Sequence, residues 1–167
     1  MSSNVFLNIF RFLLLLFLQV LLLNNINLFG YLNPQLYILF IILFPIKGNQ
    51  TLLLISSFLL GLSVDLFEDS GGVHALACLI AAYFRPYILR LLFGINYDFQ
   101  SIKFSSVSYG TKIAYIAYMV VIHHLSLYFF EFFSFSHFFS VLEKTLFSGM
   151  FTVIICLLSI SIFNNKK

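Results

Sequence analysis

Charged residues are scarce in this sequence. Lysine, arginine, aspartate and glutamate make up 9% of the 167 residues, whereas a soluble domain usually contains about 25%. With 61% hydrophobic residues and a mean hydropathy of +1.02, the chain has too few polar side chains to cover a water-facing surface. This excludes a soluble globular domain and favours a bilayer as the solvent. The length allows a single integral membrane domain over residues 1–167 and no second soluble domain.

Tryptophan is absent, and the two cysteines, Cys78 and Cys156, both lie inside apolar runs. We interpret them as buried small hydrophobic residues and not as a disulfide framework. Phenylalanine is abundant, with 23 residues, but it spreads over all apolar runs, which favours lipid-facing bulk over an aromatic box for a cofactor. The nine lysines and arginines form no patch, so no nucleic-acid partner is expected.

Motifs for catalysis and metal binding are also missing. The sequence has no P-loop, GxGxxG, HExxH or paired Cys/His pattern. His123 and His124 are adjacent, so on a helix they point about 100° apart and at most one faces a given site. Ser63 follows Gly61-Leu62 but lacks the second glycine of a nucleophile elbow. We therefore expect no catalytic residue, no metal and no cofactor.

The sequence has instead six apolar segments, which predict an all-α, polytopic transmembrane bundle of about six helices. They lie near Val5–Leu23, Gln35–Ile46, Thr51–Leu66, Val73–Leu92, Gly110–Phe130 and Ser140–Phe163. No small-residue cleavage pattern follows the first segment, so we interpret it as a retained span and not as a signal peptide. The second is the weak one, because so short a run makes about 18 Å of helix against a hydrocarbon core of about 30 Å.

Three explanations remain open for this second segment. It borrows residues from 28–33, it thins the bilayer locally, or it is a half-helix packed within protein. Pro34 suits the first turn of a helix, and Pro45 with Gly48 suits a tight turn into the third segment. These three residues are the candidate structural turn positions.

The few charges are sorted by membrane side. With a cytoplasmic N-terminus and six crossings, Lys144 is the one basic residue outside. The basic residues on the cytoplasmic side are then Arg11, Lys47, Arg90, Lys103, Lys112, Lys166 and Lys167. A non-spanning second segment would put Lys103, Lys166 and Lys167 outside, against the rule that short cytoplasmic loops carry the excess of lysine and arginine. The charge bias therefore predicts six spans with both termini in the cytoplasm.

Three residues at helical spacing form a stripe on the third segment. Ser57, Gly61 and Asp65 occur at i, i+4 and i+8, so they share one face. Ser57 and Gly61 make the small-xxx-small pattern on which membrane helices approach closely. An ionised aspartate at the centre of a spanning helix costs about 2.5–3.5 kcal/mol, so we expect Asp65 to face protein. It is a helix-packing or partner-binding residue, a proton or ligand site, or an interfacial residue that caps or ends the helix.

The turn after this helix contains Gly71-Gly72, which allow a tight bend and are followed by His74. Asp65 and His74 then lie at similar depth, where a hydrogen bond between them is either structural or pH-sensitive. Arg85 lies in the inner half of the fourth segment. Its side chain either snorkels to the cytoplasmic headgroups or is buried beside a carboxylate. Asp65 is the one acid inside a neighbouring span, but it lies about 10 Å away in depth.

These motifs, in this order, resemble those of the rod shape-determining protein MreD family. The matching features are Asn33-Pro34-Gln35-Leu36, a Pro-x-x-Gly turn, Gly-Leu-x-x-Asp, and a Gly-x-His-Ala-Leu start to the fourth segment, with Tyr83 beyond it. The resemblance covers about residues 33–83. Length and span count agree over the rest, where the phenylalanine-rich half with His123-His124 departs from the pattern.

The resemblance implies a non-enzymatic subunit of the bacterial elongation machinery in the cytoplasmic membrane, which helps to set cell shape and lateral wall synthesis. Its expected partners are MreC, a membrane glycosyltransferase with its class B penicillin-binding protein, and MreB indirectly. The family is also similar in fold to the substrate-binding subunits of energy-coupling-factor transporters, so the alternative is a vitamin or small-molecule transporter subunit. Our hypothesis for partner docking is that the helix of MreC binds the stripe of Ser57, Gly61 and Asp65, with Gly72 and His74 as further candidates.

Overall fold

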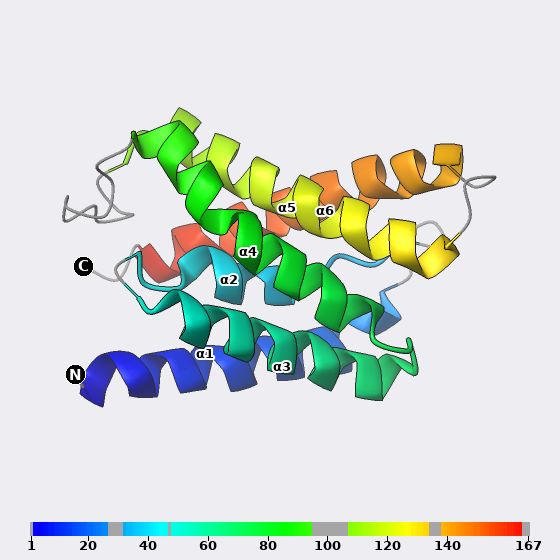
Figure 1. The fold of residues 1–167 in the computed structure, drawn as a ribbon, viewed down its shortest axis with the longest axis horizontal. Coiled ribbons are helices and arrows are strands. Elements are labelled where there is room, and N and C mark those ends of the chain that lie inside the picture. The colour runs from blue at the N-terminus through cyan, green and yellow to red at the C-terminus, as the bar shows by residue number, and fades with distance from the viewer. Residues whose placement is uncertain (1, 27–31, 47, 95–106, 134–137, 165–167) are drawn as a thin grey trace.

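The computed structural model describes residues 2–26, 32–46, 48–94, 107–133 and 138–164, and all regular structure among them is helical (Figure 1). The α-helices are α1 (Ser2–Leu21), α2 (Leu39–Leu43), α3 (Gln50–Glu68), α4 (Val73–Phe93), α5 (Tyr109–Phe132) and α6 (Phe138–Asn164). Two short 3-10 turns, η1 (Leu23–Asn25) and η2 (Leu36–Ile38), lie between α1 and α2. The prediction of an all-α chain with about six helices is confirmed.

Four of these helices, α3 to α6, are long and apolar enough to cross a membrane. The apolar part of α1, Phe6–Leu21, is shorter. The second predicted segment is the exception, because it forms a 3-residue turn (η2) followed by a 5-residue helix (α2). It is therefore too short to cross a membrane as a helix, and of the three explanations the half-helix packed within protein agrees with the structure.

The long helices are arranged around this short one. Successive helices α3, α4, α5 and α6 pack side by side, and α1 packs on α3. In the interior, α2 contacts α1, α3 and α4, while η2 contacts α1 and α6. Helix α1 begins and α6 ends at one end of the bundle, and the α3–α4 turn lies at the opposite end (Figure 1).

Local sequence signals explain where the helices begin and end. The side chain of Asn49 caps α3 by accepting a hydrogen bond from Thr51 N at 2.8 Å, and Ser108 caps α5 through Thr111 N. At the α3–α4 turn, Gly71 and Gly72 have φ values of 70° and 98°. A residue with a Cβ would be strained there, so the predicted tight turn is confirmed.

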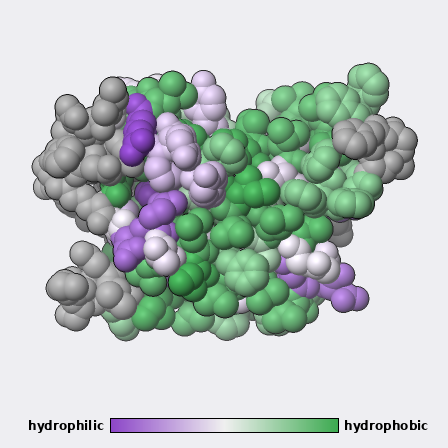
Figure 2. All heavy atoms as spheres, in the orientation of Figure 1, coloured by the Kyte–Doolittle hydropathy of each residue, from purple (hydrophilic) through white to green (hydrophobic). Residues whose placement is uncertain are grey.

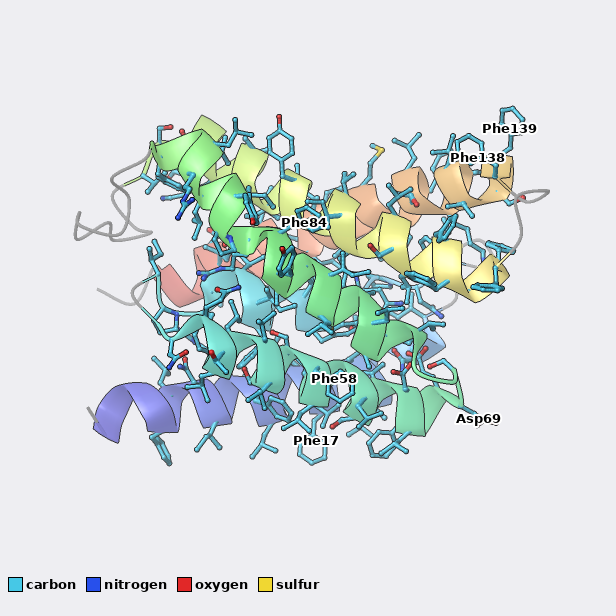
Figure 3. The ribbon with its side chains drawn as sticks, viewed as in Figure 1. Phe17, Phe58, Asp69, Phe84, Phe138 and Phe139 are labelled. Atoms are coloured by element: carbon cyan, nitrogen blue, oxygen red, sulfur yellow. The ribbon has the colours of Figure 1, made fainter. Side chains whose placement is uncertain are left out.

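The apolar surface runs across the middle of the face in Figure 2, and hydrophilic residues gather toward its two ends. Phenylalanines contribute much of this surface. Phe17 on α1 and Phe58 on α3 project away from the bundle, as does Phe139 at the start of α6 (Figure 3). By contrast, Tyr37, Ile38 and Ile41 of the η2–α2 segment are completely buried. An apolar exterior around a buried short helix is what a lipid solvent requires.

Candidate functional site: a polar framework around the short helix α2

The chain enters α2 through a non-helical stretch, residues 32–35, whose backbone groups need partners inside the bundle. Gln19, on α1, supplies several of them and is completely buried. Its Oε1 accepts from Leu36 N at 2.8 Å, and its Nε2 donates to Pro34 O at 3.0 Å and to Gln35 Oε1 at 3.1 Å. One glutamine side chain therefore takes the place of the missing helical hydrogen bonds.

Helix α6 completes this end of the framework. Ser148 Oγ donates to Asn33 O at 2.6 Å, and Thr152 Oγ1 accepts from Gln35 N at 3.0 Å. The same Thr152 oxygen lies 3.1 Å from Nε2 of the buried His124 on α5. The start of the short helix is thus attached to α1, α5 and α6 by side chains.

The opposite end of α2 leaves backbone carbonyls that no helical N–H can reach. Arg85 donates through Nη2 to Phe44 O, and Tyr115 OH donates to Ile42 O at 3.3 Å. Arg85 Nε also donates to Tyr115 OH at 2.9 Å, while Arg11 reaches Leu43 O at 3.4 Å. Arg85 is only 3% exposed, so of the two sequence-based alternatives it is buried and does not snorkel. It does not pair with Asp65.

At the centre, a row of hydrogen bonds crosses the bundle. Tyr37 OH lies 2.7 Å from Nδ1 of His74 and 3.0 Å from Nε2 of His123. On its other side, His74 Nε2 lies 2.9 Å from Glu68 Oε2. The row therefore runs from a partly exposed carboxylate to a completely buried imidazole.

With a carboxylate at Glu68 and a neutral imidazole at His74, the row has one consistent set of hydrogen-bond directions. His74 Nε2 then donates to Glu68, and His74 Nδ1 accepts from the Tyr37 hydroxyl. The Tyr37 oxygen in turn accepts from His123 Nε2. His123 Nδ1 is left as an acceptor, and it has no hydrogen-bond partner among the described residues. Cys78 Sγ lies 3.9 Å from the other nitrogen of the same imidazole.

The predicted stripe on α3 faces α4 of the same chain. A Cβ on Gly61 would come within 2.5 Å of His74 O and 2.6 Å of Ala75 Cα, so the two backbones touch. Ser57 is completely buried and Asp65 is 5% exposed. The helix-packing role agrees with this geometry. The hypothesis that MreC docks on the stripe does not, because α4 already occupies that face.

Asp65 faces protein as expected and caps the start of α4. Its Oδ1 accepts from His74 N at 3.0 Å and from Ser70 Oγ, and its Oδ2 accepts from Ala75 N at 2.8 Å. Asp65 and His74 are hydrogen bonded as the sequence suggested, but through the backbone of His74 and not through its imidazole. These N–H groups have no helical partner, so a carboxylate stabilises the helix start.

The remaining candidate residues from the sequence lie in turns or close to the starts of helices. Gly72 serves as N-cap of α4, where its positive φ is the reason for a glycine. Gly48 N donates to Pro45 O at 3.0 Å, which forms the predicted turn. A Cβ on Gly48 would also lie 2.6 Å from the ring of Phe44. Pro34 precedes η2 by two residues, so its predicted place in a first helical turn is wrong.

Sequence reasoning missed the residues that hold α2 in place, namely Gln19, Tyr37, Tyr115, Ser148 and Thr152. The available signal was a polar side chain inside an apolar run, which Gln19 and Thr152 both give. Among the described residues, no group of three or more histidine, cysteine, aspartate or glutamate side chains is arranged to hold a metal ion. The polar groups of this framework mostly bond to one another, which makes it suited to fixing a buried helix.

Comparison of the chain with protein-family models, with curated proteins and with solved structures gives no match.

Proposed function

We propose that this chain is a non-enzymatic, multi-pass subunit of the bacterial cell-elongation complex, of the MreD type, with both termini in the cytoplasm. In this role it binds MreC and helps to control cell shape and lateral peptidoglycan synthesis, together with a membrane glycosyltransferase and its class B penicillin-binding protein. The observation that carries the proposal is the ordered set of motifs between residues 33 and 83. Fold-level reasoning alone would not justify it.

The positions of these motifs support the proposal, because several of them have a physical task in one framework. Gly61 lets α3 touch α4, and Asp65 caps α4 next to His74. Pro45 and Gly48 form the turn that leads out of α2. Residues that resemble a family motif at random would have no reason to meet in this way.

A scaffold role also agrees with where the polar groups are. The framework around α2 is internal, and the exterior is mainly apolar. A single-span partner helix would therefore bind on a lipid-facing side of the bundle, by close packing within the bilayer. Since α4 covers the stripe on α3, the docking face for a partner helix consists of lipid-facing residues at other positions.

A photo-cross-linking experiment locates this face. A benzophenone amino acid replaces Phe17 (α1), Phe58 (α3), Phe84 (α4) or Phe139 (α6), one at a time, in cells that also make MreC. These side chains are 40–82% exposed and point outward (Figure 3), so an aromatic replacement should not disturb packing. The expected result is a cross-link to MreC from one side of the bundle.

The matched control is Phe40, an α2 residue that is 3% exposed and cannot reach a partner. A cross-link to MreC from every outward position, or from Phe40, would indicate random contact. The absence of any cross-link, with no co-purification of MreC from mild detergent, would contradict the proposal.

The alternative, a substrate-binding subunit of a vitamin transporter, requires a ligand site. A vitamin site needs a concave pocket with several convergent polar groups. In the described part of the chain, the Tyr37 hydroxyl is hydrogen bonded to both His74 and His123, so these buried polar groups are already paired within the bundle. Thermal stabilisation of the purified chain by a vitamin or its precursor would favour this alternative.

A further inference from the structure

A small cavity lies at the end of α2, where the chain turns toward α3. Its volume is about 180 Å³, and apolar residues 42–46 and Leu89 form most of its lining, together with Tyr115. Arg85 is the one charged side chain that lines it. A cavity of this size is smaller than the pockets of about 300–1,000 Å³ that hold drug-sized ligands. It suits a small polar group.

The charge of Arg85 is not neutralised within the described residues. The contacts found there between a basic and an acidic side chain are His74 with Glu68 and Lys144 with Glu131, and neither includes Arg85. The hydrogen-bond partners found there for Arg85 are a backbone carbonyl and the Tyr115 hydroxyl, both of which are uncharged. A buried guanidinium needs a counter-charge, because uncharged dipoles compensate only part of its lost hydration.

The cavity lies toward one end of the bundle and not at its centre. Gln50, the first residue of α3, donates to Ala82 O at 3.0 Å, so the α2–α3 turn lies level with the residues just before Arg85. This turn is at the end of the bundle where α1 begins (Figure 1). A planar guanidinium matches the geometry of phosphate or carboxylate oxygens better than that of other anions.

We propose that this cavity binds a phosphate group, with Arg85 as its charged ligand and the apolar lining in contact with the attached organic part. An apolar lining favours the phosphodiester of an anionic phospholipid. Free phosphate offers the same oxygen atoms to Arg85, and the experiment below distinguishes the two sources. This inference does not depend on the proposed function.

The test uses the full-length chain purified in mild detergent. Native mass spectrometry measures retained lipid after addition of equal amounts of phosphatidylglycerol and of diacylglycerol, which lacks the phosphate, and thermal unfolding is recorded with and without inorganic phosphate. Arg85→Gln removes the charge. Arg90→Gln is the matched control, since Arg90 lies on the same helix but is exposed and lines none of this cavity.

The expected result is retention of phosphatidylglycerol over diacylglycerol by the unchanged chain and by Arg90→Gln, with about tenfold less in Arg85→Gln. Stabilisation by inorganic phosphate that requires Arg85, without lipid preference, would assign the site to free phosphate. Arg85→Lys keeps the charge, and it should retain part of the binding even if Arg85→Gln does not fold. The lipid preference and the effect of inorganic phosphate are also measured on the unchanged chain, so the test does not depend on the folding of any variant.

Two results would overturn the proposal. One is equal retention of both lipids by the unchanged chain together with no effect of inorganic phosphate. The other is loss of stability in Asp98→Asn that equals the loss in Arg85→Gln, with no anion bound. Asp98 lies outside the described residues, and such a result would make it the counter-charge of Arg85.

Discussion

The hydroxyl group of Tyr37 lies 2.7 Å from Nδ1 of His74, and this contact joins the short buried helix region to the start of α4. The same oxygen is 3.0 Å from His123 Nε2, so one side chain links three parts of the chain. Tyr37 is completely buried, and no water can replace it without rearrangement. Its contacts therefore make α2 an integral part of the bundle and not an inserted loop.

Replacement of Tyr37 by phenylalanine should destabilise the protein. The change keeps the ring but leaves His74 Nδ1 and His123 Nε2 without their shared partner, at a cost of about 1–3 kcal/mol. Thermal unfolding in detergent measures the effect. The control is Tyr118→Phe, because Tyr118 is 48% exposed. Equal stability of the two variants would show that the row of hydrogen bonds does not stabilise the fold.

Gly61→Ala should destabilise the bundle by about 1–3 kcal/mol, because the added Cβ meets backbone atoms that cannot move independently. Gly149→Ala is the matched control on α6, where a Cβ would make an ordinary contact of 3.6 Å with Val120. Both substitutions raise intrinsic helix propensity, so that contribution cancels in the comparison. A smaller loss in Gly61→Ala than in Gly149→Ala would be inconsistent with close contact between α3 and α4.

Two threonines on α6 give a comparison of the same chemical change at different sites. Thr152→Val removes the oxygen that accepts from Gln35 N and contacts His124, so it should cost about 1–3 kcal/mol. Thr145 Oγ1 is buried without a hydrogen-bond partner among the described residues, so Thr145→Val should be neutral or stabilising. Unfolding temperatures of the two variants in the same detergent decide this. The reverse order would contradict the role of Thr152 in holding residue 35.

Orientation in the membrane follows from the charge bias and is tested by cysteine labelling. The two native cysteines are completely buried and should not react. Tyr109 begins α5 and Phe139 lies in the first turn of α6, at opposite ends of the bundle, and they are 81% and 82% exposed. A membrane-impermeant maleimide should label Phe139→Cys in intact cells and Tyr109→Cys only after the membrane is opened. The opposite pattern would place the termini outside.

The long helices were predictable, because apolar runs of sufficient length define α3 to α6 almost independently of context. The same is true of the Gly71-Gly72 turn, which depends on local backbone freedom. The stripe of Ser57, Gly61 and Asp65 was also correctly placed on one helix face. Periodicity cannot say which helix covers that face, so its assignment to a partner was wrong.

The state of the second segment was not predictable from local sequence. Whether a short apolar run crosses the membrane or lies inside a bundle depends on contacts that are distant in the chain. Gln35 meets Thr152, which is 117 residues away, and Tyr37 meets His123, which is 86 residues away. Charge sorting favoured a full crossing, whereas the observed compromise is a non-helical stretch and a short helix whose backbone is satisfied by side chains.

The most direct measurement for the proposed role in cell elongation is depletion of the protein in the cells that make it, followed by microscopy. Cells should widen and lose their elongated shape within a few generations, and a plasmid copy of the gene should restore it. A copy with Tyr118→Phe, which changes only an exposed side chain, should also restore shape, whereas a copy with the buried change Gly61→Leu should not. Unchanged width and shape after complete depletion would contradict the proposed function.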